Sequence, residues 1–152
     1  MIRWRPTSEE DVAYVMGLEG AAENAPFVTQ WSREEHVATL ADPDARHLIV
    51  ERDGERVGFV ILADLTLASR VRQILRIVIA AKGEGIGRAT LREAARICFE
   101  EHEAARVWLD VREENARARR LYESEGYVFE RRSETEPGLL ILSLDQAPRS
   151  RP

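Results

Sequence analysis

A glycine-rich segment near the middle of the chain has the composition of a phosphate-binding turn. It consists of Lys82, Gly83, Glu84, Gly85, Ile86, Gly87 and Arg88. Alternating glycines let a backbone turn tightly and approach a ligand without intervening side chains. Amides that begin a helix lack intrahelical partners and attract anions, and the flanking Lys82 and Arg88 could add charge-assisted hydrogen bonds. The segment predicts a phosphate site, although a plain strand-to-helix turn would use the same glycines.

Two common nucleotide-binding motifs do not fit this segment. A P-loop would place Lys-Ser or Lys-Thr directly after its second glycine. In a dinucleotide fingerprint the last glycine would come one residue later than Gly87, and the motif would follow the first strand of the chain. A regulatory nucleotide-binding domain that uses the glycines alone remains a second reading.

The elements around the segment predict one α/β domain. Strands are expected at residues 1–5, 47–51, 57–62, 71–79, 107–111, 127–130 and 139–144. Helices are expected at residues 8–20, 32–42, 86–103 and 116–125. Ser32 with Glu35 forms a capping box, and Asp53-Gly54 is a hairpin signal. The order predicts a mixed, mostly antiparallel sheet of about seven strands with helices on both faces, in a domain of residues 1–145 followed by a polar tail, residues 146–152.

Composition narrows the classes of partner. The net charge is −5, and a nucleic-acid partner is not expected because phosphate backbones require a basic face. A single cysteine, Cys98, excludes an intramolecular disulfide and a thiolate metal cluster, and the three histidines lack ligand spacing, so we expect no metal. No apolar run reaches the roughly 20 residues that span a membrane. We expect a cytoplasmic, soluble protein that acts as a monomer or homodimer.

Two linked motifs make the chain resemble the GNAT superfamily of N-acetyltransferases. The first is the family pattern Gln/Arg-x-x-Gly-x-Gly/Ala, which falls on residues 82–87 with Lys82 in the place of the usual Gln or Arg. The second follows in the family's order and separation, as Asn115, Ala118, Leu121, Tyr122, Gly126 and Tyr127. The expected strand order matches this fold over almost the whole chain.

The resemblance implies acetyl-CoA as co-substrate. Its diphosphate would bind the amides from Gly83 to Arg88. Its pantetheine arm would bond the backbone of the preceding strand at Ile77, Val78 and Ile79, in the manner of an added strand. The strands at 71–79 and 107–111 would splay apart to leave those backbone groups free.

The resemblance also implies catalytic roles. Tyr122 would protonate the departing thiolate as general acid. Asn115 would bind the cofactor or orient the reacting groups, and its residue type and position also suit a helix cap. Many relatives carry a catalytic Glu where this chain has Gln73, which cannot accept a proton but can hold water. The base is therefore open: a water chain, or a carboxylate such as Glu19 or Glu23, although both carboxylates could equally lie on a solvated helix face. Cys98, in the middle of a helix, is expected to pack in the core rather than carry an acyl group.

The acceptor is expected to be an amine, on either a small molecule or a protein. Variable segments at residues 19–31 and 133–138 would select it. Candidate contacts in the first segment, which could equally serve ordinary packing, are Glu19, Glu23, Asn24, Phe27 and Trp31. A coenzyme-A-binding module without transferase activity is the principal alternative, because Gln73 replaces the usual Glu.

Overall fold

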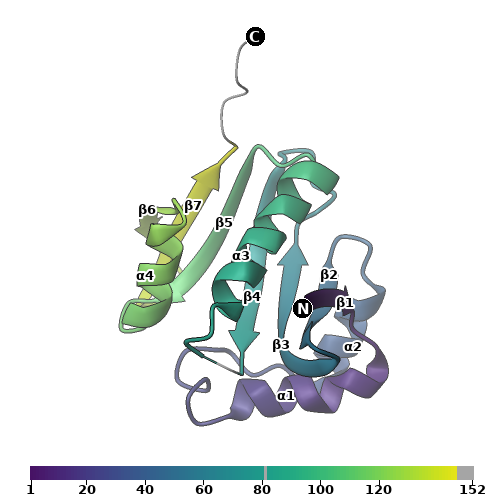
Figure 1. The fold of residues 1–152 in the computed structure, drawn as a ribbon. Helices are drawn as coiled ribbons and strands as arrows, with labels where there is room; N and C mark the ends of the chain where they lie inside the picture. Colours follow the sequence, from purple (N-terminus) through teal and green to yellow (C-terminus); the bar gives the residue numbers. More distant parts are fainter. Residues whose placement is uncertain (81, 147–152) are drawn as a thin grey trace.

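A seven-stranded sheet forms the centre of the protein (Figure 1). The computed structural model describes residues 1–80 and 82–146. The strands are β1 (Ile2–Pro6), β2 (Arg46–Arg52), β3 (Glu55–Ala63), β4 (Val71–Ile79), β5 (Arg106–Arg112), β6 (Val128–Arg132) and β7 (Leu139–Asp145). Their order in the sheet is β1-β2-β3-β4-β5-β7-β6, and only β4 and β5 pair in parallel. The expected mixed, mostly antiparallel fold of seven strands is confirmed.

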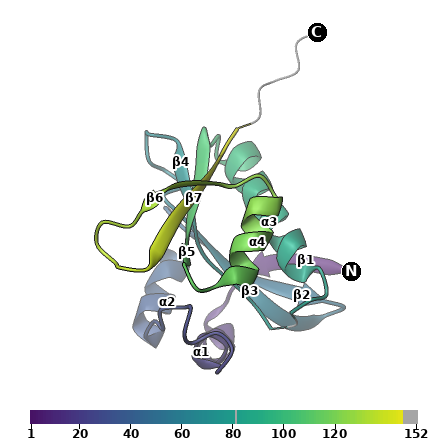
Figure 2. The ribbon, with the colours of Figure 1, turned by 90° about the vertical axis from the view of Figure 1, so that its left-hand side faces the viewer.

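Helices cover both faces of the sheet, as Figure 2 shows. They are α1 (Val12–Gly20), α2 (Arg33–Ala41), α3 (Ile86–Arg96) and α4 (Ala116–Ser124). Val15 of α1 packs with Phe59 and Val78 on one face. Leu91 of α3 and Tyr122 of α4 belong to the larger core on the other face. No helix among the described residues is long and apolar enough to cross a membrane.

Local sequence signals explain several element ends. The Ser32 side chain accepts a hydrogen bond from the Glu35 amide, and Glu35 bonds back to the Ser32 amide, so the predicted capping box begins α2. Asp53 and Gly54 both have positive φ, 52° and 84°, as the hairpin between β2 and β3 requires. Gly126, with φ 94°, follows the end of α4.

The structure differs from the sequence prediction at two helices. The helix expected at 86–103 is α-helical only to Arg96, and residues Ile97–Glu101 form a π-helical segment. The helix expected from Ser8 begins with a 3-10 turn, Glu9–Asp11, before α1. A residue inserted into a helical turn leaves no periodicity in the sequence, so pattern reasoning misses such segments. The tail expected at 146–152 lies, beyond Gln146, outside the described residues.

The parallel pair at the centre of the sheet separates along its length. Strands β4 and β5 pair only between residues 71–73 and 106–108. Beyond Gln73, β4 keeps β3 as partner on one side, and β5 keeps β7 on its far side. The gap between them exposes a strand edge whose amides and carbonyls can bind a ligand.

Candidate active site

A groove of about 1080 Å³ lies where β4, the glycine segment and α4 meet. It includes Ile77–Ile79 of β4 and runs past Lys82, Gly83, Gly85, Gly87 and Arg88 to α4. The groove therefore contains most of the residues that the sequence motif predicts for a diphosphate and its connected chain.

The glycine segment presents bare backbone to this groove. Gly83 and Gly85 have φ of 82° and 80°, a conformation that side-chain-bearing residues rarely adopt. A Cβ built on Gly85 meets no atom within 4 Å, so open space lies beyond it. Gly85 is also the N-cap of α3 and offers no side chain to the amides of Ile86, Gly87 and Arg88. These amides and the helix dipole fit a diphosphate.

The free edge of β4 continues from this turn. Hydrogen bonds alternate along an antiparallel ladder, and the Ala80 amide donates to Val57 of β3. The backbone groups of Ile77 and Ile79 therefore face away from β3, toward the gap. One of them is already engaged, because Lys82 Nζ donates to the Ile79 carbonyl at 2.9 Å. An amide-bearing ligand lying along this edge would find the Ile77 groups free of strand partners.

Cations around the groove come from two helices. Arg88 is held by Glu125 Oε2 at 2.7 Å and by Ser124 at 2.9 Å. Burial lowers the pKa of the Lys82 ammonium. Arg117 and Arg120 of α4 also line the groove. Sequence reasoning missed these two arginines, although the run from Ala116 to Arg120 places three arginines on one short helix.

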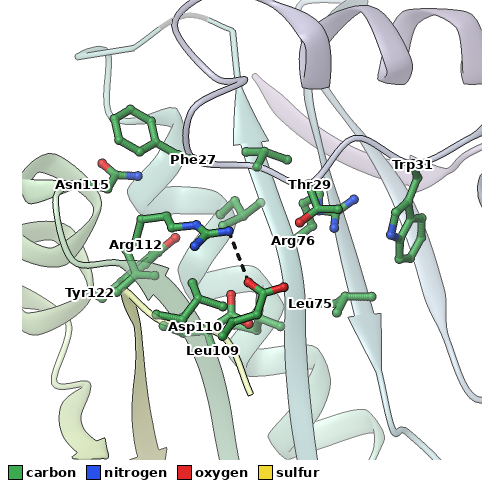
Figure 3. A pocket seen from close by; sticks show the side chains of 16 residues that line it. Phe27, Thr29, Trp31, Leu75, Arg76, Leu109, Asp110, Arg112, Asn115 and Tyr122 are labelled. Carbon is green, nitrogen blue, oxygen red and sulfur yellow. Dashed lines mark hydrogen bonds and ion pairs between the residues drawn. The ribbon is translucent and has the colours of Figure 1, made fainter. Parts of the chain in front are cut away.

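A second, smaller cavity of about 270 Å³ lies beside the gap between β4 and β5 (Figure 3). Strand β4, strand β5 and the segment from Phe27 to Trp31 surround it. The two cavities share five lining residues: Phe27, Val28, Ile77, Asn115 and Tyr122. They therefore meet through the gap between β4 and β5.

Tyr122 stands at this junction. It is buried in the α3 side of the core, lies against the ring of Tyr127, and lines both cavities. Burial raises the pKa of its hydroxyl, and the nearby Asp110 carboxylate raises it further. The hydroxyl therefore stays protonated over the physiological range and can donate a proton or a hydrogen bond to a developing anion.

Asn115 serves as the N-cap of α4. Its Oδ1 accepts a hydrogen bond from the Ala118 amide at 3.3 Å, which confirms the predicted cap. Its amide nitrogen bonds no described residue, and Asn115 lines both cavities. The cap fixes the side chain while leaving two N–H donors for a ligand.

Asp110 is a candidate that sequence reasoning missed. Its β5 neighbours Leu109 and Val111 point into the α3 side of the core, so Asp110 points to the opposite face and lines the smaller cavity. Its carboxylate accepts no hydrogen bond from a described residue. Burial raises the pKa of this carboxyl, an effect that the Arg76 guanidinium partly offsets. The sequence signal that could have identified Asp110 is its position as the acidic residue in an otherwise apolar strand.

Two residues predicted for the site, Gln73 and Glu19, line neither cavity. Gln73 is buried where β4 still pairs with β5, opposite Trp108, and it lines neither cavity. Glu19 is fully buried rather than on a solvated helix face. Its carboxylate accepts a bond from Arg76 Nη1 at 2.6 Å and lies 2.8 Å from His36 Nε2. These contacts could not be predicted from the sequence, because the partners of Glu19 are distant along the chain.

The other predicted acceptor residues lie along the segment after α1. Glu23 and Asn24 line the larger groove, Phe27 lines both cavities, and Trp31 lines the smaller one. Asn24 is also structural, since its Nδ2 donates to the Leu18 carbonyl at 2.9 Å. Trp31 lies under the guanidinium of Arg76, 4.6 Å from ring centroid to Cζ.

The remaining reactive groups of the described chain lie apart from the gap. Cys98 is fully buried in the core, and burial raises its pKa to about 12, so it is a packing residue. Within residues 1–80 and 82–146, no group of three His, Cys, Asp or Glu side chains could hold a metal ion.

Comparison with known proteins shows the family. The profile of the acetyltransferase (GNAT) family matches residues 15–127. A putative [ribosomal protein bS18]-alanine N-acetyltransferase of Bacillus subtilis is 28% identical over 120 residues, covering 77% of this chain and 74% of that protein. The spermidine N(1)-acetyltransferase of Escherichia coli K12 is 29% identical over 143 residues, covering 85% and 74%.

A solved structure extends the comparison to the fold. The spermidine N-acetyltransferase of Vibrio cholerae, in complex with CoA and spermine, superposes with a TM-score of 0.83 over 95% of both chains at 21% identity. The match over residues 15–127 covers the glycine turn, the splayed strands and Tyr122. The chain therefore belongs to the GNAT acetyltransferase family and is an acetyl-CoA-dependent N-acetyltransferase.

Proposed function

We propose that this protein moves the acetyl group of acetyl-CoA directly to a primary amine, with both substrates bound at once. The observation that carries the proposal is the junction of two cavities at the β4–β5 gap, where Ile77, Asn115 and Tyr122 line both. A thioester delivered from one face and an amine delivered from the other would meet there.

The larger groove would hold the coenzyme. The amides at the start of α3 would bind the diphosphate, with Arg117 and Arg120 adding positive charge. The pantetheine arm would follow the free edge of β4 and bond the backbone of Ile77, and that of Ile79 once Lys82 moves from its carbonyl. This course would bring the thioester to the gap beside Tyr122.

The smaller cavity would hold the amine next to Asp110. The neutral amine attacks the thioester carbonyl carbon, a C–N bond forms, and the carbonyl oxygen becomes an oxyanion. A backbone amide of residues 77–79 would stabilise that oxyanion, and one such donor is worth roughly 2.7–4 kcal/mol. Asp110 takes the surplus proton from the nitrogen.

The C–S bond then breaks, and its electron pair goes to sulfur. Tyr122 gives its proton to that sulfur, so the products are the acetylated amine and free coenzyme A thiol. Solvent carries the proton from Asp110 back to Tyr122 to restore the starting state. The buried Cys98 has no part in this sequence, so no acyl-enzyme forms.

The electrostatics of the gap support this division of roles. Burial raises the pKa of Asp110, which makes its carboxylate a stronger base than an exposed aspartate. Burial and Asp110 together keep the Tyr122 hydroxyl protonated. A base and an acid in adjoining environments is a recurrent arrangement in enzymes.

The test is coupled detection of free coenzyme A thiol with acetyl-CoA and a panel of primary amines. We expect thiol release that depends on the amine and yields the acetylated amine by mass spectrometry. Tight acetyl-CoA binding without thiol release for any amine would instead indicate the binding-module alternative. Binding of ATP or NAD, with no binding of acetyl-CoA, would indicate a nucleotide site.

A further inference from the structure

Arg76 lines the smaller cavity. We propose that Arg76 determines acceptor specificity by binding a carbonyl or carboxylate oxygen next to the reacting amine, so that the acceptor is an α-amino carbonyl group. This inference rests on the proposed function, because it assumes that the smaller cavity binds the amine.

The guanidinium of Arg76 is fixed from two sides. Its Nη1 donates to Glu19 Oε2 at 2.6 Å, and its Cζ lies 4.6 Å from the centre of the Trp31 ring. Glu19 is itself held, because the Trp31 amide donates to Glu19 Oε1 at 3.2 Å and His36 Nε2 lies 2.8 Å from the same atom. Only 10% of the Arg76 side chain is exposed. Such anchoring fixes the direction of the remaining donors.

Those remaining donors have no protein partner. Nε and Nη2 of Arg76 donate to no other residue of the described chain, although both carry N–H groups. Neither nitrogen is among the fully buried atoms that lack a partner, so an oxygen-bearing ligand in the cavity could accept hydrogen bonds from both. The second arginine of the cavity differs, because Arg112 bonds Glu136 Oε2 at 3.2 Å and the Pro137 carbonyl at 3.4 Å (Figure 3).

Asp110 supplies the complementary half of the recognition. Its carboxylate is free of hydrogen bonds from described residues, and the Arg76 charge acts on it across the same cavity. An ammonium or amine would bond Asp110, while an adjacent oxygen would bond Arg76. In an α-amino acid or the N-terminus of a peptide, the amine nitrogen and the carbonyl or carboxylate oxygen are three bonds apart.

A polyamine offers a different pattern. It carries several cations and no oxygen acceptor, so it would leave the Arg76 donors unpaired. The arrangement therefore discriminates against polyamines.

The first experiment compares acceptors on the unmodified enzyme. Alaninamide and an alanyl peptide present an amine with an amide carbonyl, free alanine presents a carboxylate, 2-aminobutane has the shape of alaninamide without the oxygen, and spermidine is the polyamine. Values of kcat/KM are expressed per concentration of neutral amine, to remove differences in amine basicity. We expect at least one oxygen-bearing acceptor to exceed 2-aminobutane and spermidine by about tenfold or more.

The ranking of the acceptors distinguishes a peptide N-terminus from a free amino acid as the substrate. It also distinguishes failure of this inference from failure of the proposed function. Preference for the peptide over alanine identifies a peptide N-terminus, and the reverse identifies a free amino acid. If 2-aminobutane or spermidine reacts as well as the oxygen-bearing acceptors, this inference is wrong while the proposed function stands. If no amine reacts, the proposed function itself fails.

The second experiment changes Arg76. In Arg76→Lys the charge beside Glu19 is kept and the guanidinium fork is lost, and in Arg76→Gln both are lost. We expect the ratio of kcat/KM for alaninamide to that for 2-aminobutane to fall about tenfold or more in each. The matched control is Arg46→Gln, which removes an exposed arginine that bonds Glu101, and its ratio should equal that of wild type. An unchanged ratio in a folded Arg76→Lys protein would show that Arg76 is only structural.

Discussion

The two cavities beside the β4–β5 gap are built from different parts of the polypeptide. The anion site that we propose for the larger groove consists of consecutive backbone amides at one turn, residues 83–88. The smaller cavity is assembled from side chains of β4, β5 and the segment after α1. Behind it, a buried polar chain runs from Arg76 through Glu19, His36 and His47 to Thr7.

This difference in construction suits two different tasks, binding of the co-substrate and selection of the acceptor. A backbone site binds the same diphosphate whatever side chains surround it, so it suits a constant co-substrate. A side-chain site can change its specificity by single substitutions, but it needs support to hold its geometry. Here that support is the buried chain of histidines and Glu19, which fixes Arg76 from behind. Substitutions on the two sides should therefore have different consequences.

The largest expected effect is on the backbone side. In Gly85→Trp the indole would fill the open space above the turn, at a backbone conformation that favours glycine. We expect acetyl-CoA affinity, measured by calorimetry, to fall more than about 100-fold. Gly54→Trp is the matched control, since Gly54 has φ 84° and open space but lies in the β2–β3 hairpin. Equal affinities in the two variants would remove the turn from the coenzyme site.

Tyr122→Phe should affect chemistry without affecting coenzyme binding. Loss of the proton donor should lower kcat by about 100-fold or more, within the usual range for a general acid. The acetyl-CoA dissociation constant should stay within about twofold of wild type. Tyr127→Phe is the control, because the Tyr127 hydroxyl is buried without a hydrogen-bond partner in the described structure. A Tyr122→Phe enzyme with normal kcat would exclude the tyrosine as acid.

Asp110→Asn should lower kcat/KM for the amine by about 100-fold. The base works only when deprotonated, so wild-type activity falls as pH drops through the pKa of Asp110. Burial raises that pKa above its ordinary 3.8, which moves the acid limb of the profile upward. The limb should be absent from the profile of the variant. Persistence of the same limb in Asp110→Asn would assign it to another group.

The smallest expected effect concerns the support behind the acceptor cavity. Burial, together with the neighbouring His36, lowers the pKa of His47 from 6.5 to about 4. The unfolded chain therefore binds more protons between these values, and folding stability falls as pH drops through that window. From pH 7 to pH 5 the free energy of unfolding should fall by about 2 kcal/mol.

Urea denaturation at both pH values measures this change. His47→Gln, which does not titrate, should lose correspondingly less between the two values. An equal loss in wild type and variant would show that His47 is not the group responsible.

The same contrast explains how far the sequence could lead. The glycine turn could be predicted because the backbone conformation at Gly83 and Gly85 requires glycine. The helix starts at Ser32 and Asn115 could be predicted because a cap and its partner lie within four residues of each other. Asp110 carried no such signal, since its role depends on strands brought together by the fold. The burial of Glu19 could not be predicted from the sequence, because its partners His36 and Arg76 are 17 and 57 residues away.

A crystal structure with bound acetyl-CoA tests the central claim most directly. We expect the diphosphate on the amides of residues 83–88 and the thioester in the β4–β5 gap, with its sulfur next to the Tyr122 hydroxyl and its carbonyl open to Asp110. A coenzyme bound elsewhere, or a thioester separated from the smaller cavity by protein side chains, would contradict direct transfer through the gap.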